Sequence, residues 1–126
     1  MESKSSYTLI LAAKPGVGPS PGGEGWDSYA AEYMAFNEEI AAAGVLKGGE
    51  PVHPPDTATT VRVSDGEVKL HDGPFAELDE QVIGWYLIEV ENLDDAVAWA
   101  ANIPVASRGY GAVEVRANVD FTQGAN

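Results

Sequence analysis

Two long apolar segments constrain the fold of this chain more than any other feature. Residues 7–13 and 82–91 consist almost entirely of aliphatic, aromatic and β-branched side chains. Runs of this length and composition are typical of strands in the middle of a sheet that is covered on both faces. Both runs are too short to cross a bilayer, which takes about 20 apolar residues. We therefore expect a domain built around a buried sheet.

Two helices are predicted between and after these strands. The first begins at Asp27 or Ser28, either of which suits an N-cap, and it ends before Gly44, where a left-handed residue is favoured. Its apolar residues recur at intervals of three and four, as on one face of a helix. The second helix runs from the capping residue Asn92 to Pro104, which interrupts the helical pattern.

The remaining segments predict further strands and one connection. Residues 57–64 and 67–71 flank Asp65-Gly66, which is a strong signal for a two-residue hairpin turn, and residues 112–119 alternate between apolar and polar side chains. Residues 45–55 contain paired glycines and paired prolines, and we expect an irregular connection there. The order β-α-β-β-α-β, with the hairpin as the middle pair, predicts an α+β ferredoxin-like fold. A single domain covers residues 1–126, with frayed ends at 1–6 and 122–126.

The charge of the chain excludes several classes of partner. Seven basic residues stand against 20 acidic ones, for a net charge of −13, which argues against nucleic acid and against an anionic membrane surface. The chain has no cysteine, and its first residues lack a basic region followed by an apolar core, so we expect a cytoplasmic protein. No metal-ligand spacing and no phosphate-binding loop is present, so we expect neither metal nor cofactor.

The predicted fold leaves one face of the sheet without cover. Both helices lie on the same face in this topology. The other face carries Glu114 and Arg116, and by alternation it also carries either Trp85 with Leu87 or Tyr86 with Ile88. An open face that bears aromatic side chains would be a large apolar patch. A second copy of the chain is the simplest cover, so we expect a homodimer with a cleft between the sheet and the partner.

The segment from Asp72 to Glu77 (Asp-Gly-Pro-Phe-Ala-Glu) combines a rigid turn with an aromatic residue of the buried type. Proline fixes its own φ and excludes the preceding residue from the helical region. Asp72 is the first candidate for catalysis, as a general base or as a group that holds a polar ligand. The alternative is a carboxylate that accepts backbone N–H bonds and fixes the turn, which is the commoner role of such an aspartate.

Five other residues are candidates for a site. His53, among prolines, could transfer a proton, although a loop histidine is more often simply solvated. Glu114 and Arg116 share one strand face, where they could bind a polar or anionic ligand or form a structural ion pair. Trp85 and Phe75 could line a pocket, although large aromatic residues in a small domain are usually part of the core.

Several segments together resemble the YCII-related family, and in particular its Asp-Gly-Pro-Phe branch. The matching segments, in the expected order, are residues 42–46, 48–50, 59–63, 72–77, 84–88, 93–96 and 113–116. The resemblance implies a ferredoxin-like fold in a dimeric α/β-barrel assembly. It also implies a regulatory context linked to alternative sigma factors. From the resemblance we expect a small-molecule-binding or accessory protein with a polar cleft between its subunits.

The sequence departs from the family pattern where chemistry is concerned. Some relatives carry a His-Asp pair proposed to be catalytic, with the histidine in the first helix and the aspartate just before the proline that ends the second. Here no histidine precedes His53, and Asn102 and Ile103 stand before Pro104. Leu78-Asp79 also replaces the usual Thr-Lys after the turn. The alternative to a binding protein is a cofactor-independent lyase or hydrolase-like enzyme that uses Asp72 on a small aromatic or polar metabolite.

Overall fold

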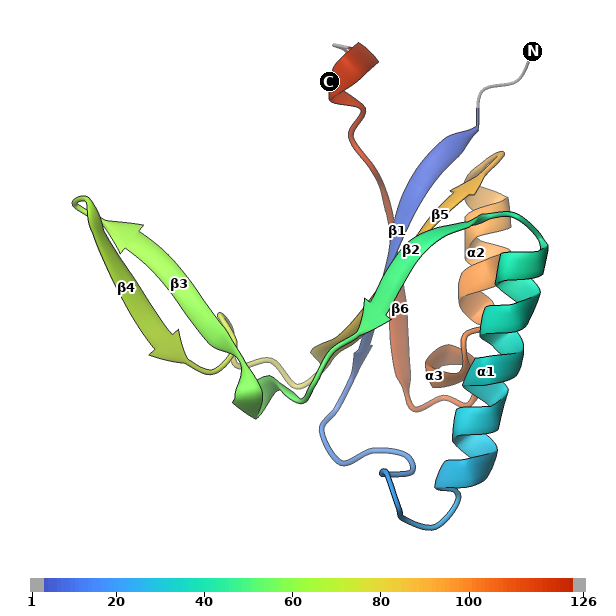
Figure 1. Ribbon diagram of the computed structural model, residues 1–126, viewed down its shortest axis with the longest axis horizontal. Coiled ribbons are helices and arrows are strands. Elements are labelled where there is room, and N and C mark those ends of the chain that lie inside the picture. The colour runs from blue at the N-terminus through green and yellow to red at the C-terminus, as the bar shows by residue number, and fades with distance from the viewer. Residues whose placement is uncertain (1–3, 124–126) are drawn as a thin grey trace.

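The computed structural model describes residues 4–123 and shows a four-stranded antiparallel sheet backed by helices (Figure 1). The strands are β1 (Ser5–Ala13), β2 (Leu46–Pro51), β5 (Gln81–Val90) and β6 (Gly111–Ala117), in the spatial order β2-β5-β1-β6. Every neighbouring pair is antiparallel. This α+β arrangement is consistent with the expected ferredoxin-like fold.

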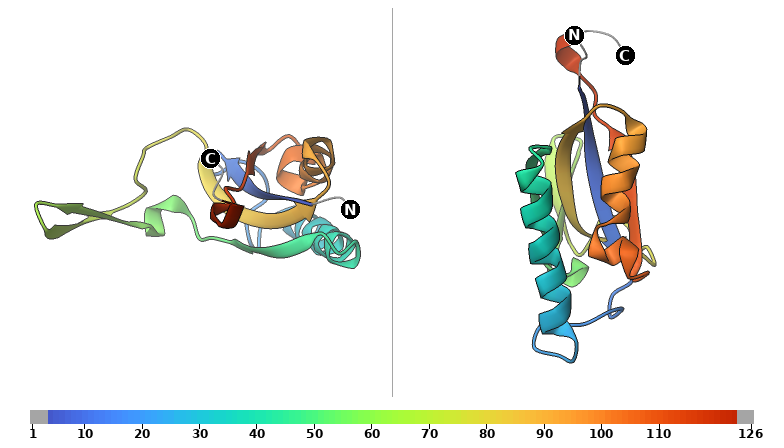
Figure 2. Two further views of the ribbon diagram at one scale, coloured as in Figure 1. Left: turned by 90° about the horizontal axis from the view of Figure 1, so that it is seen from above. Right: turned by 90° about the vertical axis from the view of Figure 1, so that its right-hand side faces the viewer.

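Three helices lie together on one side of the sheet, as both views in Figure 2 show. They are α1 (Trp26–Ala42), α2 (Leu93–Ala101) and the single turn α3 (Pro104–Ser107). Asn92 caps α2 as predicted, because its side-chain oxygen accepts a hydrogen bond from the Asp95 N–H at 2.9 Å. Two 3₁₀ turns, η1 (Pro55–Thr57) and η2 (Phe121–Gln123), complete the described elements.

The core lies between the sheet and these helices. Leu9, Ile40 and Ile88 are fully buried there, and α3 with its preceding residue adds Ile103 and Val105. The Phe36 ring of α1 meets Tyr86 edge-on, at 5.5 Å between ring centroids, and Trp99 at 6.2 Å. One side-chain face of β1 and β5 is therefore packed against helices, and the other is left outside this core.

A hairpin stands apart from the sheet. Its strands β3 (Thr59–Ser64) and β4 (Glu67–Asp72) pair with each other, and they extend away from the side of the sheet opposite the helices (Figures 1 and 2). We call residues 59–72 the arm. Its tip is the predicted two-residue turn, with φ of 52° at Asp65 and 78° at Gly66, as a type I′ turn requires.

The structure corrects the expected strand order. Residues 45–55 were predicted to be irregular, but β2 forms there and is the second strand of the sheet. The prediction was wrong because two glycines hide the strand: Gly49 has φ of 148° and lies directly against the backbone of β5. The arm is consequently an insertion between β2 and β5, which are the middle two of the four sheet strands in chain order, with β2 at one edge of the sheet.

Smaller differences concern element ends. The predicted N-caps Asp27 and Ser28 are wrong, because α1 begins one residue before them and its N-cap is Gly25, with no side-chain cap. Pro104 does interrupt the second helix, but it also occupies the first turn of α3, where a proline fits well. Ser5 already lies in β1, inside the range for which fraying was expected, while residues 1–3 and 124–126 lie outside the described part of the chain.

Candidate functional site

The face of the sheet that the helices leave open carries three of the predicted site residues. In the strand register Trp85 lies opposite Ile10, which in turn lies opposite Glu114. One row further along, Leu87 and Arg116 lie on either side of Thr8. Directly opposite residues share a face. Trp85 and Leu87 are therefore the aromatic and aliphatic members of the open face, and their neighbours Tyr86 and Ile88 point into the core.

Trp85 is the largest side chain on this open face, with 38% of its surface exposed. Its ring reaches over β2, where a Cβ placed at Gly48 would lie 3.9 Å from the ring atoms. On the far edge strand, Arg116 Nη1 donates to Glu114 Oε2 at 3.0 Å, and both side chains are well exposed. An exposed pair of this kind contributes little to stability. Its donors and acceptors are therefore available to a ligand at small cost.

A hollow of about 320 Å³ lies where the arm joins the body, and we call it the arm-root hollow. The lining residues come from the segments on both sides of the arm: Val52, His53, Pro55, Thr57, Ala58, Thr59, Thr60, Pro74, Phe75, Gln81 and Val82. His53 and Phe75, separated by 22 positions in sequence, thus share one site. Most of the lining is apolar, with the imidazole, the threonines and one amide as the polar groups, as in small-molecule sites generally.

Hydrogen bonds to the backbone of Gly73 hold the turn after Asp72 in place. The Gly73 N–H donates to the Ala58 carbonyl at 2.7 Å, and Thr60 Oγ1 donates to the Gly73 carbonyl at 2.8 Å. Gly73 has φ of 117°, which a residue with a side chain rarely adopts. The Phe75 ring, expected to be buried, is 73% exposed in this single chain. The turn is therefore fixed by its glycine and its carbonyls, and it presents the aromatic ring outward.

The Asp72 carboxylate takes no part in this network. Within residues 4–123 its side chain has neither a hydrogen-bond nor an ion-pair partner, so the turn-fixing role is not what the structure shows. Asp72 lies opposite Thr59 at the root of the arm, outside the lining of the arm-root hollow. Arg116 lies on β6, at the edge of the sheet remote from β2. Asp72, Arg116 and a histidine are therefore not gathered in one enclosed pocket of a single chain, as the enzyme hypothesis would need.

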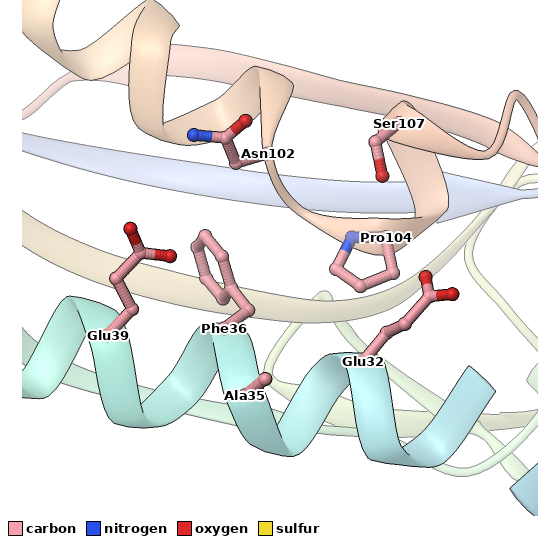
Figure 3. A pocket seen from close by; sticks show the side chains of 7 residues that line it. All are labelled: Glu32, Ala35, Phe36, Glu39, Asn102, Pro104 and Ser107. Carbon is pink, nitrogen blue, oxygen red and sulfur yellow. The ribbon is translucent and has the colours of Figure 1, made fainter. Parts of the chain in front are cut away.

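A second hollow, of about 390 Å³, lies on the helical side between α1 and the segment around α3 (Figure 3). Glu32 and Glu39 flank it from α1, and Asn102 and Ser107 face it from the other wall. Glu32 is bound by Arg108, whose guanidinium holds the pKa of that carboxyl below its usual range. The hollow lies between the two segments that carry the His-Asp pair in some relatives. Here these segments supply carboxylates, an amide and a hydroxyl, and sequence reasoning did not anticipate the hollow.

No group of three or more histidine, aspartate or glutamate side chains within residues 4–123 is arranged to hold a metal ion. None of the helices in this described range is long and apolar enough to span a membrane.

The fold defines a small α+β protein with an antiparallel sheet, consistent with the ferredoxin-like type, and comparison with known proteins gives its family. Residues 7–122 match the YCII-related domain, so the chain belongs to the YCII-related family. It is also similar to Uncharacterized protein R00369 of Rhizobium meliloti (strain 1021), with 39% identity over 85 residues, which make up 68% of each chain.

Proposed function

We propose that this protein is a cytoplasmic homodimer of the Asp-Gly-Pro-Phe branch that binds a small polar or anionic molecule in a cleft between its subunits, as an accessory or regulatory protein rather than an enzyme. The sequence pattern supports the dimer. Both central strands have the composition of strands covered on two faces, yet the helices cover one face. A second copy on the open face would complete the cover.

The single observation that carries the proposed cleft is the position of the arm-root hollow. Val82 lines the hollow and pairs with Ala12. Ala12 lies two positions after Ile10, so the two side chains share the open side of β1. Trp85 follows three positions along β5, within about 10 Å, and the register shift between Leu11 and Ala12 brings it to the same side of the sheet as Val82. The hollow and the open face therefore form one continuous surface, on which apolar area surrounds a few polar groups.

The chemistry of this surface indicates the ligand class. The Phe75 and Trp85 rings suit the apolar body of a small molecule, while the polar end could meet His53 or the Arg116 guanidinium. Within residues 4–123 the Asp72 carboxylate has no hydrogen-bond or ion-pair partner, and the His-Asp pair of other relatives is absent. Binding without turnover is therefore the function that the residues support best.

A ligand screen by thermal shift, with small aromatic and aliphatic carboxylic acids and amides, tests this proposal. We expect a hit to raise the melting temperature of the wild type by an amount that grows with the logarithm of ligand concentration above the dissociation constant. Phe75→Ala should weaken binding by about tenfold or more in calorimetry, as loss of an aromatic anchor does. Phe121→Ala is the matched control, because that ring is 79% exposed and lies in η2, outside the hollow. Equal affinities for the two variants would exclude the arm-root hollow as the binding site.

A further inference from the structure

The two faces of the arm differ sharply in character. Val61 pairs with Leu70 and Val63 pairs with Val68, which places four apolar side chains on one face. These four side chains are 59–69% exposed. The other face carries the polar pairs, including Arg62 opposite Lys69. We call the first of these the apolar face of the arm, and Asp72 lies at its root end.

A hairpin with an exposed apolar face needs a partner. An isolated two-stranded hairpin is marginal in water, and stability comes from packing its apolar side on something else. In both views the arm extends beyond the body of its own chain, so the body does not provide that packing (Figures 1 and 2). An alternating strand pair of this kind is also a typical surface for protein association.

The area of the proposed dimer indicates what the arm packs on. From strands of six to ten residues, the open face of one sheet spans about 500 Å² in plan, so two facing sheets contribute about 1,000 Å². Specific interfaces bury about 1,200–2,000 Å². One face of the arm spans about 200 Å² from two strands of six residues, and two arms with the surface beneath them add about 800 Å². The arms bring the total into the range of a stable dimer.

We propose that the arm clasps a second copy of this chain, with the apolar face of the arm packed on the partner's body. The inference rests on the homodimer of the proposed function and adds to it. The arm leaves its own body on the side where the partner would lie, so the clasp continues the contact between the open faces. The arm-root hollow and Asp72 then lie at the border between the two subunits, and the ligand cleft has a wall from each copy.

Sedimentation of arm variants tests the clasp. Val61→Thr combined with Val63→Thr keeps shape and β-branching but makes the apolar face polar. We expect this variant to raise the dimer dissociation constant at least tenfold. Val97→Thr is the matched control, because Val97 is exposed on α2, on the helical side of the molecule. A dimeric wild type with an unchanged constant in the double variant overturns the clasp and leaves the homodimer standing. A monomeric wild type at about 100 μM, well above typical dimer constants, overturns both.

A spin label provides a test that leaves the apolar face of the arm unchanged. The chain has no cysteine, so Ser64→Cys at the arm tip gives one labelling position. Labelled chains are mixed with ¹⁵N-labelled wild-type chains, so any broadening of the wild-type amide signals crosses from one copy to the other. We expect broadening in a contiguous patch on the body of the ¹⁵N chain. Broadening of no body amide in a mixture shown to be dimeric would overturn the clasp.

Discussion

Gly49→Ala is the substitution for which the structure gives the most definite consequence. A Cβ at this position would lie 2.5 Å from the Trp85 carbonyl oxygen and 3.0 Å from Tyr86 Cα, both of them backbone atoms that cannot rotate away. The φ of 148° adds backbone strain of about 1–3 kcal/mol for a residue with a side chain. Forcing β2 away from β5 adds an overpacking cost of about 1–3 kcal/mol. We expect Gly49→Ala to lower the free energy of unfolding by about 2–6 kcal/mol.

The neighbouring glycine is a control of the same chemistry. A Cβ at Gly48 would meet Leu87 Cβ and the Trp85 ring at 3.9 Å, which is ordinary van der Waals contact, and its φ is not in the left-handed region. Gly48→Ala should therefore change stability by less than about 1 kcal/mol, with some gain from the reduced freedom of the unfolded chain. Adjacent glycines in one short strand are thus expected to differ by several kcal/mol.

Urea unfolding followed by tryptophan fluorescence measures both variants, since Trp85 lies beside the mutated strand. A shift of the midpoint at constant m-value gives the difference directly. If the two alanine variants proved equally stable, the close approach of β2 to β5 would be wrong. If Gly49→Ala lowered the m-value instead, the edge strand β2 would have detached while the rest of the sheet stayed folded.

Three further predictions concern the core and its polar contacts. Ile40→Ala should cost about 2–5 kcal/mol in urea unfolding, because the side chain is fully buried, while Met34→Ala on the exposed side of α1 should cost less than about 0.5 kcal/mol. The Arg108 guanidinium lowers the pKa of Glu32 below its ordinary 4.5, so the stability that Glu32 contributes is present at neutral pH and is lost as the pH falls through this lowered pKa. The melting temperatures of the wild type and Glu32→Gln should therefore converge in acid. The Tyr33 hydroxyl accepts a hydrogen bond from the Val105 N–H at 3.2 Å, so Tyr33→Phe should cost about 0.5–1.5 kcal/mol at neutral pH. Burial raises the pKa of Tyr33 in the folded state, so only the unfolded chain ionises just above pH 10, and the wild type should lose stability faster than this variant as the pH rises above 10.

The sequence predicted the elements whose signals are local. The two central strands, both longer helices, the cap at Asn92 and the turn at Asp65-Gly66 all depend on residues within a few positions of one another. The strand β2 was missed because its glycine pair has the composition of a loop. Its strand conformation is imposed from outside, by hydrogen bonding to β5, and such tertiary pairing leaves no periodic pattern in six residues.

The candidate site was predictable as residue types but not as an arrangement. His53 and Phe75 meet because the chain leaves the sheet after β2 and returns at β5, which no spacing in the sequence encodes. The enzyme hypothesis needs Arg116 and Asp72 in one pocket, yet they lie on the edge of the sheet and on the arm. The direction of the arm decides this distance, and that direction is set by a few turn residues at its root.

The way the arm is attached has a consequence for how such proteins diverge. The strands that flank it, β2 and β5, are neighbours in the sheet, and Val52 still donates to the Ile83 carbonyl at 3.0 Å just where the chain departs. Lengthening, shortening or exchanging the inserted segment therefore changes no strand register and no core residue. Descendants of an ancestral chain could acquire new self-recognition or new ligand preference by altering residues 53–80 alone, while the folding of the sheet and helices remained under separate selection.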